Sequence, residues 1–188
     1  MLPKTLLYTD VPEDLQAHLE QHTDLKQIES LAGTSRSELQ SLLSDVEGLI
    51  GVGETVGPDI LELAPNLKVA STISVGFDHF DVADLTKRGI MLMHTPDVLT
   101  ETTADMVFSL ILCAGRRITE VSDLVRQGRW TEFIGSEFFG TDIYGKKLGI
   151  LGMGRIGQAV ARRAFAGFNM EVLYHSRSVK EQAEKDFK

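Results

Sequence analysis

Short apolar runs alternate with amphipathic segments in the first half of the chain. The apolar runs predict five strands, at residues 5–9, 25–28, 48–52, 68–73 and 90–93. Between them, apolar residues recur three or four positions apart, which predicts helices from residue 12 onward and at 35–43, 58–63 and 82–88. Alternating strands and helices are typical of an α/β fold with a largely parallel sheet, and this succession favours a flavodoxin-like arrangement.

Capping residues support these helix boundaries. Pro12 is placed to open the first helix, and Gly89 is placed to close the fourth. Asp78 and Asp81 are spaced like metal ligands, but an aspartate just before a helix more often caps it. We therefore expect Asp81 to cap the helix that begins at Val82, and we predict no metal site.

A longer helical stripe follows between residues 100 and 128. Its apolar positions, three and four apart, are Val107, Leu110, Ile111, Ala114, Ile118, Val121, Leu124 and Val125. Thr100 is the predicted N-cap, and Gly128 lies where the helix should end. One helix of this length exceeds the usual globular range, so we expect it to bridge two domains or to pack against a second subunit. Residues 96–100 are the candidate hinge.

The change of pattern near residue 99 predicts two domains, residues 1–98 and residues 99–188. After the long stripe, residues 129–144 are irregular and rich in aromatic side chains. These are Trp130, Phe133, Phe138, Phe139 and Tyr144. Core packing or contact with a second subunit is their expected role.

A glycine motif lies between two predicted strands in the second domain. The strand at residues 147–151 leads into the turn GMGRIG at 152–157, a helical stripe ends at Gly167, and a further strand follows at 170–174. A strand, a G-x-G-x-x-G turn, a helix and a second strand are the context that a dinucleotide-binding fingerprint requires. A glycine-rich turn that binds nothing is the alternative.

Each glycine of the motif has a physical role in that context. Gly152 allows the tight turn, Gly154 lets the backbone approach a pyrophosphate, and Gly157 lets the helix pack close to the strand. The helix N-terminus then offers unpaired N–H groups and a positive dipole end to the phosphates. Arg155 and Ile156 are assigned to the same cofactor site.

The end of the second strand distinguishes NADP from NAD. An NAD site usually carries an Asp or Glu there, which accepts hydrogen bonds from the ribose hydroxyls. This chain has no carboxylate at the strand's end, and it offers Arg177, Ser178 and Lys180 as donors for a 2′-phosphate. The sequence therefore favours NADP, with NAD as the weaker candidate. The alternative is that Arg177 and Lys180 are solvated charges that open the next helix.

Composition narrows the class of protein further. Hydrophobic residues make up 43% and charged residues 24%, which is ordinary for a globular protein, and the net charge of −8 disfavours nucleic acid as a partner. The acidic excess lies in residues 1–99, so the slightly basic remainder is the expected host of an anionic ligand.

No apolar run is long enough for a membrane span, and no secretory signal begins the chain. With Cys113 as the single cysteine, a cytoplasmic location is expected.

Three passages carry a family resemblance. They are STISVGFD at residues 71–78, HTPDVLTETTAD at 94–105 and LGILGMGRIGQ at 148–158. Together they resemble the D-2-hydroxyacid dehydrogenase family, and within it the branch of glyoxylate/hydroxypyruvate and 2-ketogluconate reductases. The resemblance covers the whole chain. It implies a flavodoxin-like substrate-binding domain, the first half of a Rossmann dinucleotide-binding domain, and a homodimer contact through the helix at 100–127.

The resemblance also implies a place for the substrate. The carboxylate of a small 2-keto acid would be held by backbone N–H groups of the loop that contains Val75 and Gly76. A loop after a strand can form such an anion-binding nest, although an ordinary turn is the alternative. Thr103, in the second passage, is assigned to the cofactor site.

The family's catalytic Arg, His and Glu do not map onto any residue of this sequence. His175 lies at the 2′-phosphate end of the predicted cofactor site, whereas His79 and His94 fall in the first domain and match no catalytic position. A complete dinucleotide fold has about six strands, and the chain supplies the first two. We therefore expect the chain to be the N-terminal part of a longer enzyme, and to be inactive by itself.

Two functions are weighed for the whole protein. The leading hypothesis is an NADPH-dependent oxidoreductase that converts glyoxylate, hydroxypyruvate or 2-ketogluconate to the D-2-hydroxy acid. The alternative is a dinucleotide-sensing binding module of the corepressor type, without catalysis. The NADP-type strand end and the resemblance of residues 71–78 to the reductase branch argue against this alternative.

Overall fold

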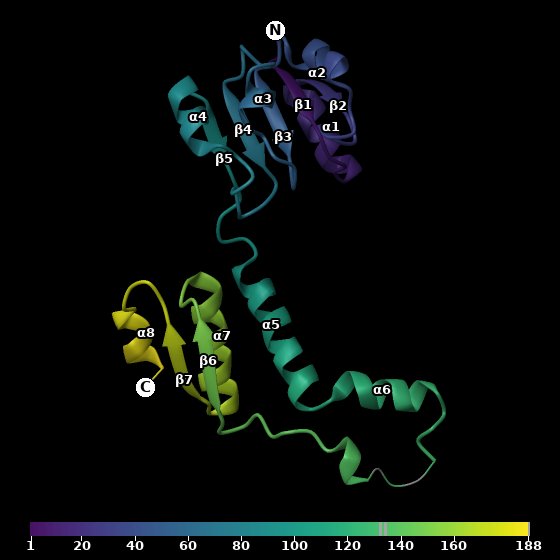
Figure 1. Ribbon diagram of the computed structural model, residues 1–188, viewed down its shortest axis with the longest axis vertical. Coiled ribbons are helices and arrows are strands. Elements are labelled where there is room, and N and C mark those ends of the chain that lie inside the picture. Colours follow the sequence, from purple (N-terminus) through teal and green to yellow (C-terminus); the bar gives the residue numbers. More distant parts are fainter. Residues whose placement is uncertain (132, 134, 188) are drawn as a thin grey trace. The chain divides into compact units, whose positions relative to one another are not determined.

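The computed structural model describes residues 1–131, 133 and 135–187. The chain divides into two compact units, Met1–Pro96 and Asp97–Lys188 (Figure 1). The division lies two residues before the domain boundary predicted from the sequence. No helix among the described residues is both long enough and apolar enough to cross a membrane.

The first unit is built on a five-stranded parallel sheet. Its strands are β1 (Lys4–Leu7), β2 (Asp24–Gln27), β3 (Gly48–Gly51), β4 (Val69–Thr72) and β5 (Met91–Met93). They lie in the order β2-β1-β3-β4-β5, and every pairing is parallel. This is the flavodoxin-like order, so the predicted α/β class and layout are confirmed.

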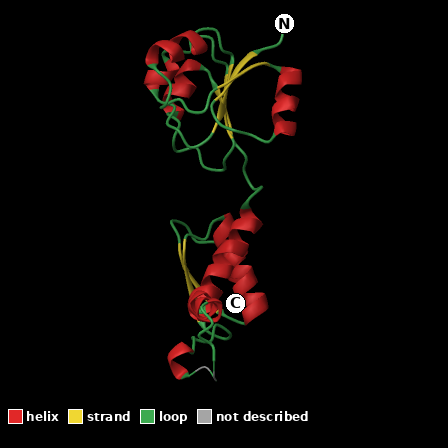
Figure 2. Ribbon diagram, turned by 90° about the vertical axis from the view of Figure 1, so that its right-hand side faces the viewer, coloured by secondary structure: helices red, strands yellow, loops and turns green. Residues whose placement is uncertain are grey.

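Helices cover both faces of this sheet (Figure 2). They are α1 (Glu13–His22), α2 (Arg36–Leu43), α3 (Pro58–Leu61) and α4 (Val82–Arg88). The expected cap of α4 is confirmed, because Asp81 Oδ1 accepts a hydrogen bond from the Asp84 N–H at 2.9 Å. Gly89 ends α4 in the left-handed region, at φ 70°, as its position predicted.

The core of the first unit lies between the sheet and the helices α2, α3 and α4. Leu6, Leu49 and Ala70 of the strands are fully buried there. The Tyr8 ring lies against Gly51 of the neighbouring strand, where an added Cβ would overlap it. Close packing of an aromatic ring on a strand therefore depends on a glycine at this position.

The predicted single helix between residues 100 and 128 is wrong. The structure has two helices, α5 (Thr100–Gly115) and α6 (Ile118–Arg126), separated at Arg117, which adopts φ 52°. The Thr141 N–H donates to the Gly115 carbonyl at 2.7 Å, so a chain crossing replaces the next hydrogen bond of the helix. The apolar stripe resumes beyond the break, and the periodicity therefore does not reveal it.

The predicted N-cap of this region also differs. Thr100 is the first residue of α5, and Leu99, which has no side-chain acceptor, occupies the cap position. The cap of α6 is Arg117, again without a side-chain hydrogen bond. The Arg117 guanidinium instead donates to Glu120 at 2.9 Å, one turn into α6.

The second unit also contains the predicted strand, turn, helix and strand. These are β6 (Lys147–Leu151), α7 (Arg155–Phe168) and β7 (Glu171–His175), followed by α8 (Glu181–Asp186); β6 and β7 pair in parallel. The helix does not end at Gly167 as predicted. It continues to Phe168, and Asn169 closes it in the left-handed region at φ 49°.

Small side chains bring α5 close to α7. Ala104 of α5 and Ala159 and Ala164 of α7 are all buried in one cluster. At the rim, Arg162 binds Glu101 at 2.7 Å, and its hydrogen bond lowers the pKa of that carboxyl. This packing fixes the first turn of α5 beside the helix that follows the glycine motif.

The aromatic segment between α6 and β6 is irregular, apart from a short 3₁₀ helix, η1 (Ser136–Phe138). Trp130 is 55% exposed and Phe133 is 91% exposed. Core packing within the described chain is therefore wrong for these two side chains, because more than half of each is exposed. Contact with a second subunit remains a prediction.

We expect Gly51→Ala to destabilise the first unit by about 1–3 kcal/mol, because the new methyl group would overlap the Tyr8 ring. Gly33→Ala is the matched control, since its Cβ would lie 3.4 Å from Ser30 in an ordinary contact. Urea-induced unfolding followed by circular dichroism measures both. Equal free energies of unfolding for the two variants would contradict the packing argument.

Candidate functional site

The glycine turn of the second unit has the geometry of a phosphate-binding loop. Gly152 follows β6 at φ 97°, a conformation that favours glycine. Gly154 is the N-cap of α7, and an added Cβ there would meet no atom within 4 Å. The backbone at Gly154 therefore faces open space on the side where a ligand would approach.

Gly157 holds the turn against the helix. A Cβ at this position would overlap the carbonyl oxygen of Gly152, so the helix reaches the turn only because residue 157 has no side chain. The helix thus comes closest to the turn at the end of β6. The side chain of Ile150 in the strand is farther away, because its Cγ2 would lie 3.4 Å from a Cβ added at residue 157. The predicted close packing is present, but its main partner is the turn.

The first turn of α7 presents unpaired backbone donors. The N–H groups of residues 155–157 have no partner within the helix, because the first turn of any α-helix lacks preceding carbonyls. The Arg155 Nε lies 2.8 Å from Asp97 Oδ1, so its charge is already paired. Ile156 is partly exposed beside it. This end of the helix can therefore accept an anion through main-chain N–H groups.

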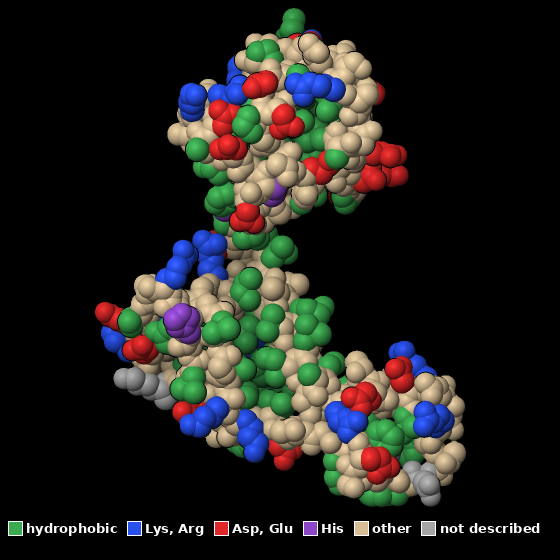
Figure 3. Space-filling view, viewed as in Figure 1, with side chains coloured by type: hydrophobic (Ala, Val, Ile, Leu, Met, Phe, Trp, Pro, Cys, Tyr) green, Lys and Arg blue, Asp and Glu red, His purple; other side chains and the backbone are tan. Residues whose placement is uncertain are grey.

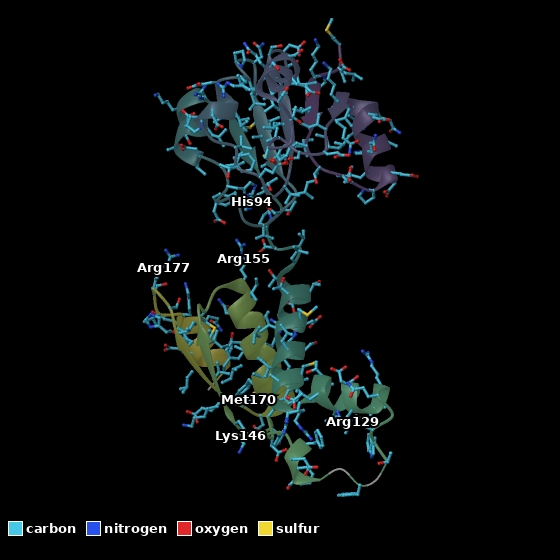
Figure 4. The ribbon with its side chains drawn as sticks, turned by 45° about the vertical axis from the view of Figure 1, so that its right-hand side comes forward. His94, Arg129, Lys146, Arg155, Met170 and Arg177 are labelled. Carbon is cyan, nitrogen blue, oxygen red and sulfur yellow. The ribbon has the colours of Figure 1, made fainter. Side chains whose placement is uncertain are left out.

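A cleft of about 500 Å³ joins the glycine turn to the end of β7. Its lining residues are Gly152, Gly154, His175, Ser176, Arg177, Ser178 and Lys180. Figure 4 shows Arg155 and Arg177 at the same end of this unit, and Figure 3 shows basic side chains gathered there. The structure therefore brings together two of the motif glycines and the three predicted strand-end donors, although they lie more than 20 positions apart.

The strand-end donors are held in a fixed loop. The Lys180 N–H donates to the Tyr174 hydroxyl at 2.9 Å, and that hydroxyl donates to Glu184 at 2.9 Å. The Lys180 Nζ donates to Ser178 Oγ at 3.0 Å. Arg177 is exposed and makes no ion pair with any residue that the structure describes.

Carboxylates are absent from the described lining of this cleft. Glu171 lies at the opposite end of β7, where it binds Lys147 at 2.9 Å. A cleft with basic donors and no acid favours an anionic group. Thr103, by contrast, lies in the first turn of α5, outside the cleft lining, and its N–H donates to the Leu99 carbonyl at 2.9 Å.

The predicted substrate loop lies in the first unit, directly after β4. Three consecutive carbonyls of this loop accept hydrogen bonds from the protein. The Thr95 N–H donates to the Ser74 carbonyl at 3.0 Å, and His94 Nδ1 donates to the Val75 carbonyl at 3.0 Å. Within the loop, Ser74 Oγ donates to the Gly76 carbonyl at 2.6 Å. A second hydroxyl, Thr72 Oγ1, lies 2.7 Å from Ser74 Oγ. The loop is therefore tied down through its carbonyl oxygens.

The amide N–H groups of Val75 and Gly76 have no acceptor among the described residues. Gly76 does not adopt a positive φ, so its backbone conformation does not itself require glycine. Sequence reasoning assigned no role to His94 or Ser74. The available signal was position, because His94 follows β5, and the carboxyl ends of neighbouring parallel strands meet at one edge of a sheet.

A buried polar group lies away from both sites. The Tyr8 hydroxyl is buried without a hydrogen-bond partner among the described residues. Burial, together with the nearby Glu54 carboxylate, raises the pKa of Tyr8 to about 12. The Glu54 carboxylate itself accepts the N–H groups of Leu31 at 3.0 Å and Ala32 at 2.7 Å. The Tyr8 hydroxyl is therefore protonated and neutral at physiological pH. The Glu54 carboxylate holds the loop that contains Leu31 and Ala32.

Comparison with known proteins gives one family. The family model described as "D-isomer specific 2-hydroxyacid dehydrogenase, catalytic domain" matches residues 5–184. The chain is 51% identical over 187 residues to glyoxylate/hydroxypyruvate reductase B of Yersinia enterocolitica, a match that covers 100% of this chain and 57% of that protein. The chain thus spans little more than half the length of this relative.

Solved structures agree with the fold. An NADPH-dependent glyoxylate/hydroxypyruvate reductase from Sinorhizobium meliloti, in complex with NADP and malonate, is similar with a TM-score of 0.80 and 29% identity. The match covers 96% of this chain and 55% of that one. D-Lactate dehydrogenase from Aquifex aeolicus, complexed with NAD and lactic acid, gives a TM-score of 0.84 at 27% identity, covering 97% and 54%.

We expect Gly157→Ala to destabilise the second unit by about 1–3 kcal/mol and to weaken binding of any dinucleotide at the turn, because the methyl group would push the turn away from the helix. Gly167→Ala in the same helix meets no atom within 4 Å and should stabilise the helix by about 0.5–1 kcal/mol. Chemical unfolding and NADPH fluorescence measure both effects. A Gly157→Ala variant that matches the parent chain in both would overturn this account of the turn.

Proposed function

The chain belongs to the D-isomer specific 2-hydroxyacid dehydrogenase family, and on this premise we propose that the whole protein reduces a small 2-keto acid with NADPH. The family resemblance predicted from the sequence is confirmed by the family model and by the relatives. The family consists of oxidoreductases that act on CH–OH groups and bind NAD(P). The substrate, the preference for NADP and the assembly proposed below go beyond that membership.

The observation that carries the proposal is the cleft between the glycine turn and the strand end. The turn offers helix N-terminal N–H groups to a pyrophosphate. Arg177, Ser178 and Lys180 lie where the adenosine ribose of a dinucleotide is held in this type of fold. One cleft therefore has donors for both anionic parts of the cofactor.

Preference for NADP follows from the charge at the strand end. A carboxylate would accept ribose hydroxyls and repel a 2′-phosphate, whereas a guanidinium and an ammonium attract it. Relatives of both kinds exist, because the Sinorhizobium meliloti protein is NADPH-dependent and the Aquifex aeolicus enzyme is complexed with NAD. The strand end of this chain supports the first kind, with NAD as the weaker candidate.

The proposed substrate is glyoxylate, hydroxypyruvate or 2-ketogluconate, as the names of the relatives and the resemblance suggest. The N–H groups of Val75 and Gly76 would bind its carboxylate. When bound, the nicotinamide cofactor supplies the hydride for the keto carbon. The acid that protonates the oxygen and the group that polarises the carbonyl are not assigned to any residue of this chain.

A homodimer through α5 and α6 is also proposed. Met106 and Leu110 of α5 are 61% and 60% exposed, and Figure 3 shows hydrophobic side chains gathered along this helix. Large apolar side chains on one exposed face are typical of an interface. Because the predicted long helix is broken at Arg117, the contact would involve two helices. A cytoplasmic location is proposed on the sequence evidence.

The NADP preference is tested with the two adenosine fragments that differ only in the 2′-phosphate. We expect this chain to bind 2′,5′-ADP more tightly than 5′-AMP, by about tenfold or more, because hydrogen bonds to charged groups contribute about 1.5–3 kcal/mol. Arg177→Ser should remove most of that difference. Arg126→Ser, on the exposed last turn of α6, is the matched control and should leave it unchanged. Calorimetric titration gives all six affinities.

Equal affinity of the parent chain for the two fragments would contradict the NADP preference. The reductase activity is a separate question, followed as NADPH oxidation with hydroxypyruvate and glyoxylate. The 188 residues alone are expected to bind NADPH without turnover, and the whole protein is expected to turn over. Binding without turnover by the whole protein would support the sensing module instead.

A further inference from the structure

The loop after β4 is oriented by its carbonyl groups. In a trans peptide, the C=O of one residue and the N–H of the next point in opposite directions. A donor that holds the Ser74 carbonyl therefore also aims the N–H of Val75, and a donor that holds the Val75 carbonyl aims the N–H of Gly76. Each predicted substrate-binding N–H is thus controlled by a different contact.

These two contacts come from consecutive residues. The Thr95 N–H holds the Ser74 carbonyl, and His94 Nδ1 holds the Val75 carbonyl, both at 3.0 Å. The first is a main-chain contact, which any substitution at residue 95 other than proline leaves in place. The second depends on one imidazole. The orientation of the Gly76 N–H therefore depends on the His94 side chain.

We propose that His94 is a positioning residue, whose Nδ1–H holds the Val75 carbonyl so that the Gly76 N–H is presented to the carboxylate of the 2-keto acid. This inference rests on the proposed function, because it needs the loop to bind a carboxylate. His94 itself touches neither substrate nor cofactor in this role. It acts only through the peptide bond between Val75 and Gly76.

The surroundings of His94 suit this role. A carbonyl oxygen can only accept, so Nδ1 must carry the proton, which specifies the Nδ1–H tautomer when the ring is neutral. The Phe77 ring packs edge-to-face on the imidazole, with centroids 5.1 Å apart, and limits its rotation. The side chain is half-buried at the carboxyl-end edge of the sheet (Figure 4).

The position of His94 in the chain adds a second consequence. His94 and Thr95 are followed by Pro96, the last residue of the first unit. Both contacts that aim the loop N–H groups therefore come from the segment that leaves this unit. The two residues that follow β5 therefore also orient the loop that contains Val75 and Gly76.

The test is a titration of the 188-residue chain with oxalate, a stable dicarboxylate. The binding is monitored by NMR through the ¹⁵N–¹H resonances of Val75 and Gly76. Oxalate should shift both amides in the parent chain, with one dissociation constant. His94→Phe keeps a planar ring but has no donor, and it should weaken binding about fivefold to tenfold and lose the Gly76 shift. The Val75 shift should persist, because the Thr95 contact remains.

Two further variants separate positioning from a general structural effect. His94→Asn places an amide N–H close to the former Nδ1 position and should restore binding to within about twofold of the parent. His22→Phe makes the same change on the exposed last turn of α1 and should alter neither affinity nor shifts. A His94→Phe variant that binds oxalate like the parent, with both shifts intact, would overturn the proposal.

A readout without ligand keeps the two proposals distinguishable. The ¹⁵N shifts of the imidazole report its tautomer, and the Nδ1–H form is expected for His94. An Nε2–H tautomer would exclude the positioning contact, whatever oxalate does. If the Nδ1–H form is found but oxalate shifts neither amide in the parent chain, the substrate role of the loop fails, and the His94 proposal fails with it.

Discussion

Parallel pairing of every described strand is the constraint from which both candidate sites follow. Parallel strands need crossover helices, so all carboxyl ends lie at one edge of each sheet, and each helix begins near that edge. Loops there have backbone N–H groups without partners in the sheet or helix. The loop after β4 that contains Val75 and Gly76 and the glycine turn after β6 both arise in this way, although they lie in different units.

Unpaired N–H groups can bind an anion only when they point toward it, and the two sites orient their N–H groups differently. In the glycine turn, absence of side chains lets α7 reach the carbonyl of Gly152, and the helix itself orients the donors. In the loop after β4, hydrogen bonds to three successive carbonyls fix the peptide planes. The first site depends on glycine, whereas the second depends on polar neighbours such as His94 and Ser74.

Much of the fold could be predicted from local patterns. The five strands of the first unit, the helix caps at Asp81 and Gly89, and the strand–turn–helix–strand around Gly152 all formed as expected. These features depend on residues within a few positions of one another. The break at Arg117 could not be predicted, because it comes from a chain crossing at Gly115 by residues about 25 positions later, and the apolar period continues through it.

The candidate sites divide in the same way. The family resemblance, the glycine motif and the basic strand end were all evident in the sequence, because each is a run of neighbouring residues with a fixed chemistry. The folded chain was needed to show that the strand end and the motif share one cleft, that Thr103 lies outside it, and that His94 contacts the carbonyl of Val75. Contact between residues of neighbouring strands depends on sheet order and register, which no local sequence pattern contains.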